Sequence, residues 1–167
     1  MFLALRIVHI ITGVFWAGSV FFIISFLQPA LRDVGPEGSK VFGALRARRM
    51  FTWTPVMALF TILSGFWLYM VRMGGAPGWA RTREAMTLGT GAVAAVLAFF
   101  VGVFMMRAPS LRAADLAAQA GPMPAGAEKD RLMAEAASLR ARATMGGRTV
   151  GTLLLVTVIA MAVARYL

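Results

Sequence analysis

The chain has 167 residues, of which 59% are hydrophobic, and its formal net charge is +10. It contains no cysteine, which excludes disulfides, thiolate metal sites and cysteine nucleophiles. Its basic residues lie in polar segments beside long apolar runs, without interleaved aromatic residues, so we expect no binding to nucleic acid.

Four long apolar runs dominate the chain, at residues 3–27, 51–71, 86–106 and 149–167. Each is close to the ~20 apolar residues that a helix needs to cross a ~30 Å hydrocarbon core. None alternates with the period of two that is typical of a membrane barrel strand. The sequence therefore predicts an all-α polytopic membrane four-helix bundle, with residues 1–167 in a single domain.

The first span carries the only histidine of the chain, His9, about two turns from its start. Gly13 and Trp16 follow at i+4 and i+7, so the three residues share one helix face and form a notch beside an aromatic wall. A histidine within a bilayer needs a polar partner. Two interpretations stay open: a structural, hydrogen-bonded histidine, or a ligand of a metal or a planar cofactor.

Small residues recur where helices are expected to pack closely. Ala94, Ala98 and Gly102 follow one another at four-residue spacing in the third span, and Gly147 and Gly151 open the fourth. Such ridges let helix backbones approach each other where lipid supplies no hydrophobic drive for association. We expect them to serve packing within the chain.

Residues 107–148 are predicted to form a helical hairpin that extends spans three and four beyond the membrane. A turn with two prolines and two glycines divides this segment. The returning helix carries a stripe with Leu132 and Leu139, which we expect to pack on Leu111 and Leu116 of the preceding helix.

The distribution of basic residues predicts the topology. Twelve lie in the first and third connectors: Arg32, Lys40, Arg46, Arg48, Arg49, Arg107, Arg112, Lys129, Arg131, Arg140, Arg142 and Arg148. Five lie on the opposite side: Arg6, Arg72, Arg81, Arg83 and Arg165. The positive-inside rule then predicts that the hairpin is cytoplasmic and that both termini lie on the outer side of the membrane.

The acidic residues all fall in connectors or at their edges: Asp33, Glu37, Glu84, Asp115, Glu128, Asp130 and Glu135. Proton-coupled transport usually relies on a carboxylate within the membrane, so this distribution argues against a secondary transporter. It also leaves no carboxylate pair and no Ser-His-Asp set within the spans. We therefore assign no catalytic residue, and whether the chain is an enzyme stays open.

Several side chains are expected at the depth of His9, near the outer ends of the spans. They are Met70, Met86, Met161 and Arg165, together with Trp16 on the same face of the first span. Histidine nitrogen and methionine thioether are the ligand pair of some haem and copper sites, and arginine neutralises haem propionates. These residues make up a candidate cofactor site for haem b or copper, with His9 as the metal ligand.

Residues 5–18 read LRIVHIITGVFWAG, with a histidine followed by a Trp-x-Gly step. Further motifs are RR at 48–49, LSG at 63–65 and APSL at 108–111. This pattern resembles a group of small bacterial membrane families. They are the copper-resistance D (CopD)-like proteins, their uncharacterised four-helix relatives, the membrane domain of a bacterial urate oxidase and the HemJ-type protoporphyrinogen oxidases. The likeness covers nearly the whole chain and is closest to the uncharacterised relatives.

In the HemJ-type and urate oxidase relatives the histidine of the first helix is associated with haem b, and the resemblance implies this role for His9. The chain departs from a two-histidine haem pattern because it has a single histidine. A six-coordinate haem would therefore need a methionine, another residue or a second copy of the chain.

Three classes of function follow from these features. The first is a haem- or copper-associated protein of redox chemistry or metal homeostasis that works at His9. The second is a non-catalytic accessory or assembly subunit, whose hairpin docks on a membrane-protein partner. The third is a small transporter, which the missing intramembrane carboxylates disfavour. In each case the lipid bilayer is the expected surrounding, and the oligomeric state stays open.

Overall fold

The computed structural model describes residues 2–167, apart from the side chain of Pro36, and its regular elements are all helices. They form four long columns. The first joins α1 (Phe2–Phe22), the π-helical η1 (Ile23–Leu27) and α2 (Gln28–Asp33), and the second is α4 (Met50–Gly75). The third joins α5 (Arg83–Val101), the π-helical η4 (Gly102–Arg107) and α6 (Ala108–Ala120), and the fourth is α7 (Ala127–Val163). Short helices complete the chain: η2 (Gly35–Glu37), α3 (Gly38–Ala47), η3 (Trp79–Arg81) and η5 (Ala164–Tyr166).

All four columns are long and apolar enough to cross a membrane: Phe2–Asp33, Met50–Gly75, Arg83–Ala120 and Ala127–Tyr166. The prediction of an all-α chain with four apolar helices of membrane-spanning length is confirmed. The helices are longer than the predicted spans. The first column does not end at residue 27 but continues to Asp33, and the second continues past residue 71 to Gly75.

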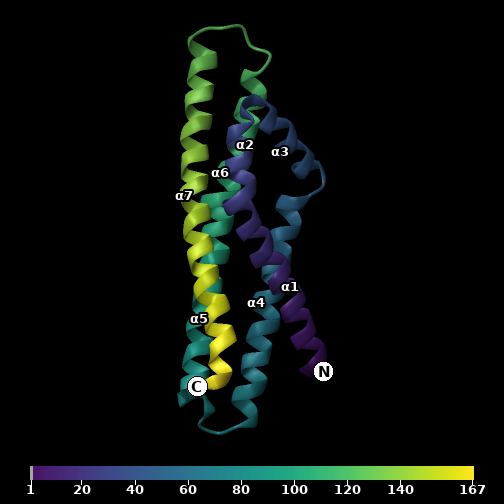
Figure 1. The fold of residues 1–167 in the computed structure, drawn as a ribbon, viewed down its shortest axis with the longest axis vertical. Helices are drawn as coiled ribbons and strands as arrows, with labels where there is room; N and C mark the ends of the chain where they lie inside the picture. The colour runs from purple at the N-terminus through teal and green to yellow at the C-terminus, as the bar shows by residue number, and fades with distance from the viewer. Residues whose placement is uncertain (1) are drawn as a thin grey trace.

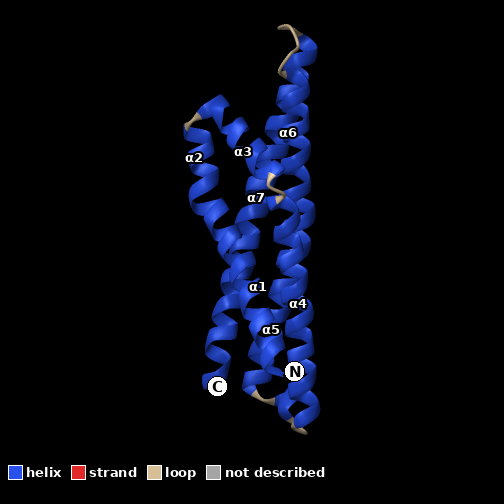
Figure 2. Ribbon diagram, turned by 90° about the vertical axis from the view of Figure 1, so that its right-hand side faces the viewer, coloured by secondary structure: helices blue, strands red, loops and turns tan. Residues whose placement is uncertain are grey.

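The two chain termini lie at the same end of the molecule as the connection between α4 and α5 (Figure 1). The loop between α6 and α7 and the short helices α2 and α3 lie toward the other end (Figures 1 and 2). Within the bundle, α1 packs mainly on α4, whereas α5 and α6 pack on α7.

The central core joins all four columns through Trp16 and several smaller side chains. Its buried members are Trp16 and Val20 from α1, Ala58 from α4, Ala95 and Ala98 from α5, and Val150 and Leu154 from α7. Large apolar side chains such as Ile11, Leu63 and Phe100 are exposed instead. Small residues inside and large apolar residues outside are the pattern expected of helices that pack against each other in lipid.

The α6–α7 hairpin has a core of its own, formed by Ala113, Leu116, Ala120, Leu132 and Ala136. Leu139 packs against it, so the predicted contact of the returning leucine stripe with Leu116 is confirmed. Leu111 is half-buried and is not a member of this core. The helix α7 runs without interruption from the hairpin into the fourth span, and its glycines Gly146, Gly147 and Gly151 lie close to side chains and backbone of the first and third columns.

Candidate functional site

His9 is partly buried in the interface between α1 and α4. Its Nδ1 lies 2.8 Å from the carbonyl oxygen of Thr61, so the Nδ1–H group donates to this carbonyl. Ser64 Oγ lies 3.4 Å from the same nitrogen. A neutral imidazole that donates through Nδ1 keeps its lone pair on Nε2. The structure thus gives His9 the expected polar partner, and in the neutral tautomer that donates from Nδ1 the nitrogen available to a metal is Nε2.

Two buried threonines continue this polar contact toward the bundle centre. Thr61 Oγ1 lies 2.9 Å from Thr12 Oγ1, and Thr12 in turn donates to the carbonyl of Val8 at 2.8 Å. Gly65 lies directly beside the imidazole ring, since a Cβ atom there would come within 2.7 Å of His9 Cε1. We call His9, Thr12, Thr61 and Gly65 the histidine cluster. It joins α1 to α4 by hydrogen bonds and by close packing.

The other predicted cofactor residues lie in different surroundings. Trp16 is buried in the central core, and the side chains of Met70 and Met86 are exposed. Met161 faces Gly91 of α5, and the Arg165 guanidinium lies 5.1 Å from the centre of the Tyr166 ring. Among the described residues, no hydrogen bond or ring contact joins any of these side chains to His9.

Within the described residues, His9 belongs to no cluster of His, Cys, Asp and Glu side chains. No group of three or more His, Cys, Asp or Glu side chains within residues 2–167 is placed to hold a metal ion. The N-terminal end of α1 and the C-terminal end of α7 lie apart in both views (Figures 1 and 2). Met161 and Arg165 lie in α7 and η5, whereas Met70 lies in α4, the helix that packs on α1, but its side chain is exposed.

The histidine cluster predicts a specific coupling between His9 and Gly65. Gly65→Ala should displace the imidazole from the Thr61 carbonyl and destabilise the protein by about 1–2 kcal/mol, the cost of a strained contact and a lost hydrogen bond. In a His9→Ala background the same change should be neutral or stabilising. Thermal unfolding in detergent measures both effects, and Gly74→Ala in the same helix is the control, since no atom lies within 4 Å of its added Cβ. An equal cost of Gly65→Ala in both backgrounds would refute the coupling.

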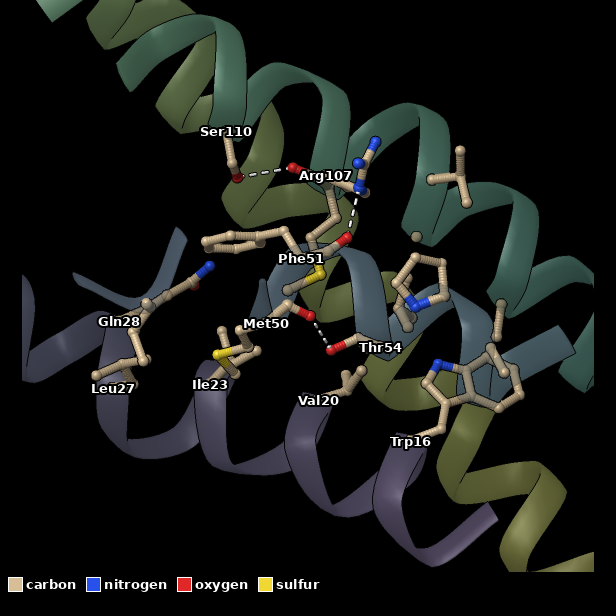
Figure 3. Close-up of a pocket in the computed structure, with 18 of the residues that line it drawn as sticks. Trp16, Val20, Ile23, Leu27, Gln28, Met50, Phe51, Thr54, Arg107 and Ser110 are labelled. Carbon is tan, nitrogen blue, oxygen red and sulfur yellow. Dashed lines mark hydrogen bonds between the residues drawn. The ribbon is translucent and has the colours of Figure 1, made fainter. Parts of the chain in front are cut away.

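A second site lies where the first three columns meet, as an apolar cavity of about 90 Å³. Figure 3 shows its walls. Trp16, Val20, Ile23 and Leu27 come from the first column, Met50, Phe51 and Thr54 from the start of α4, and Arg107 and Ser110 from the third column. The lining is almost entirely apolar, and no carboxylate contributes to it.

Arg107 is the one charged side chain that lines this cavity, and a proline explains its position. Pro55 lies inside α4 and has no N–H group, so it cannot donate to the carbonyl of Phe51 four residues earlier. Arg107 Nε donates to this carbonyl instead, at 2.7 Å. The guanidinium is half-buried and makes no ion pair with a described carboxylate. A cation with only a neutral partner thus borders an apolar space.

Two other prolines shape the cavity walls. The π-helical segments η1 and η4 each end two residues before a proline, Pro29 and Pro109. A proline ring clashes with the carbonyl four residues earlier in an α-helix, and a π-helical turn relieves that clash by shifting the hydrogen-bond register. Both segments contribute cavity-lining residues. Such turns occur frequently at functional sites.

Glycines of α7 allow both π-helical segments to dock. A Cβ atom on Gly146 would lie 2.6 Å from the carbonyl oxygen of Met105 in η4. A Cβ atom on Gly151 would overlap the end of the Ile24 side chain from η1. The fourth column therefore holds η4 at a distance that only glycine permits at position 146, whereas at Gly151 the flexible end of Ile24 fills the space.

The short helix α3 lies beside the cavity, with Phe42 and Leu45 in the lining. The Phe42 ring lies 4.7 Å from that of Phe51, measured between ring centres. One turn further along α3 from Phe42, Arg46 forms an ion pair with Asp115 of α6. α3 thus borders the cavity and is tied to the hairpin column.

Sequence reasoning missed this cavity. In the sequence, Arg107 contributed only to the prediction of topology. Pro55 lies within an apolar span, and no role was predicted for it. The signal that points to the site is a set of three prolines, Pro29, Pro55 and Pro109, each placed inside or beside an apolar run.

Comparison of the chain with protein-family models, with curated proteins and with solved structures finds no match.

Proposed function

We propose that the protein binds, in the Arg107 cavity, an amphipathic molecule with a single apolar chain and an anionic head group. The observation that carries the proposal is a half-buried arginine without a carboxylate partner at the edge of an apolar cavity. An anionic group beside Arg107 would gain a charge-assisted hydrogen bond, and an apolar chain would fill the space next to it.

The size of the cavity supports a slender ligand. Its volume of about 90 Å³ is smaller than the roughly 150 Å³ of an engineered protein cavity that takes up benzene. A few carbon atoms of one alkyl or isoprenoid chain fit such a space, whereas a porphyrin does not.

The positions of the lining residues along the helices indicate how the ligand is oriented in the cavity. Arg107 directly follows the third apolar run, and Met50 directly precedes the second, so this end of the cavity lies at the boundary of the apolar segments. Trp16, Ala58 and Ala98 belong to the centre of the bundle. A ligand with its head at Arg107 would extend its chain toward the bundle centre.

The first test of this function compares two ligands with the same chain. A fluorescent long-chain fatty acid should bind to the purified protein in nanodiscs of phosphatidylcholine. The alcohol of the same chain length should compete about tenfold more weakly than the acid, because it lacks the charge that Arg107 recognises. Equal competition by the alcohol would contradict recognition of an anionic head.

The proposed setting is the inner membrane of a bacterium, with the hairpin cytoplasmic and both termini periplasmic. The excess of basic residues in the first and third connectors supports it. The chain has no cysteine, so a single introduced cysteine is the only residue that a thiol reagent can label. Ala76→Cys, in the α4–α5 connection, should react with a membrane-impermeant reagent in intact cells, and Ser39→Cys should not. The opposite labelling pattern would reverse the topology.

A second candidate function is haem binding through His9 in an assembly with a second copy or another subunit. Its support is the lone pair on Nε2, fixed by the bond from Nδ1 to Thr61, together with the resemblance to the HemJ-type and urate oxidase families. Protein purified after expression with ample haem should then show a Soret band that His9→Ala removes and Met57→Leu retains. A wild-type protein without this band would eliminate the haem candidate. Copper binding is tested by the copper content of protein purified after expression with ample copper.

A further inference from the structure

A groove rich in arginine lies between α2 and α7, away from the Arg107 cavity. Its volume is about 460 Å³, and its lining consists of Arg32, Ala137, Arg140, Ala141, Thr144, Met145 and Arg148. None of the lining residues of this groove lines the cavity, and no acidic residue contributes to it. It is therefore a separate site with a different chemistry.

The groove is held by a contact between its two walls. Arg32 Nη2 donates to Thr144 Oγ1 at 3.2 Å, and this hydroxyl donates to the carbonyl of Arg140 at 3.0 Å. The contact fixes the guanidinium of Arg32 halfway between Arg140 and Arg148 along α7. Those two arginines are eight residues apart, which corresponds to about 12 Å along a helix.

Arg32, Arg140 and Arg148 differ from the arginines that form ion pairs. Arg46, Arg72 and Arg131 each form an ion pair with a carboxylate. Within residues 2–167, the structure gives Arg32, Arg140 and Arg148 no such partner. Three guanidinium groups that share a groove without a carboxylate repel one another, and an anion between them would relieve this repulsion.

The position of the groove relative to the apolar runs indicates which anion it meets. Arg148 directly precedes the fourth apolar run, and Arg32 follows the first by five residues. In a chain with four membrane-spanning helices, this level is that of the lipid head groups. The exposed side chains of Met145 and Ala141 add apolar surface between the arginines. Basic pockets between helices at this level suit phospholipid phosphates.

We propose that this groove binds the head group of an anionic phospholipid, and that a lipid with two phosphates fits it best. One phosphate would lie between Arg32 and Arg148, on the membrane side. The other would lie between Arg32 and Arg140, one turn further out. The proposal is independent of the ligand of the Arg107 cavity, since the two sites share no residue.

The experiment measures binding of cardiolipin, which carries two phosphates, to the purified chain in a neutral detergent. A fluorescent cardiolipin is displaced by unlabelled cardiolipin, by phosphatidylglycerol, by phosphatidylcholine or by inorganic pyrophosphate. We expect cardiolipin to compete best, phosphatidylglycerol several-fold more weakly, and phosphatidylcholine and pyrophosphate only at far higher concentrations. Pyrophosphate that competes as well as cardiolipin would overturn the lipid assignment in favour of a soluble anion.

Two double variants distinguish binding in this groove from general electrostatic attraction of the lipid to the basic surface. Arg140→Gln with Arg148→Gln should weaken cardiolipin binding by roughly thirtyfold. Arg112→Gln with Arg142→Gln removes the same charge from exposed positions outside the groove and should change it less than about threefold. Equal losses in the two double variants would overturn the proposal.

Thr144→Val tests the site with a smaller change that is not expected to unfold the protein. Thr144→Val removes only the hydroxyl that holds Arg32, and it should weaken cardiolipin binding several-fold while helical content, measured by circular dichroism, stays at the wild-type level. Unchanged binding in this variant would show that Arg32 is not held in place for the lipid and would overturn its assigned role.

Discussion

Gly146→Ala should destabilise the protein by about 2–3 kcal/mol, although alanine is the better helix former. The added Cβ would lie 2.6 Å from the carbonyl oxygen of Met105 and 2.7 Å from its carbon. Both are backbone atoms of η4, so neither can move without shifting the whole third column against α7. Thermal unfolding in detergent, followed by circular dichroism, measures the loss.

Gly18→Ala is the matched control for this change. Gly18 also lies within an apolar helix, but no atom lies within 4 Å of its added Cβ. It should therefore stabilise the protein by about 0.5–1 kcal/mol, the usual gain for alanine over glycine in a helix. If the two substitutions have the same sign, the close contact between α7 and η4 does not govern stability.

Arg107→Gln is expected to have the second large effect, on both stability and binding. The variant loses the donor to the Phe51 carbonyl, at a cost of about 1–3 kcal/mol, and it loses the charge that would hold an anionic head. Fatty-acid affinity should fall about tenfold or more. Arg107→Lys keeps the charge and should retain most of the affinity.

Pro55→Ala separates the two roles of Arg107. Alanine at this position restores the N–H group that can donate to the Phe51 carbonyl within α4. In this background Arg107→Gln should no longer cost stability, yet fatty-acid affinity should still fall. If affinity returns together with stability, Arg107 acts only on the fold and not on the ligand.

The sequence predicted the features that depend on composition and on local spacing. Runs of about twenty apolar residues predict helices of spanning length, whatever these helices contact. The stripe with Leu132 and Leu139 predicts a packed hairpin, because a short turn joins the two helices and leaves few other surfaces that the stripe could contact. Of the small residues predicted to pack, the structure buries Ala94, Ala98, Gly147 and Gly151, and Gly102 is half-buried.

The remaining features depend on how each helix is rotated about its axis, which depth alone does not determine. His9 and Thr61 are 52 residues apart and meet only because α1 and α4 turn these faces toward each other. The Met86 side chain is exposed, and Met161 packs against Gly91 of α5 and not against His9. The π-helical segments likewise depend on docking against α7.

The most direct measurement of the central proposal is the position of the bound chain. A fatty acid with a photoreactive diazirine near its methyl end is crosslinked to the protein in nanodiscs, and the modified residues are identified by mass spectrometry. The proposal predicts adducts at Trp16 and on the segments around Ala58 and Ala98 in the bundle centre, and Arg107→Gln should abolish them. Adducts restricted to outward-facing side chains such as Ile11 and Leu63, equally abundant in the variant, would contradict it.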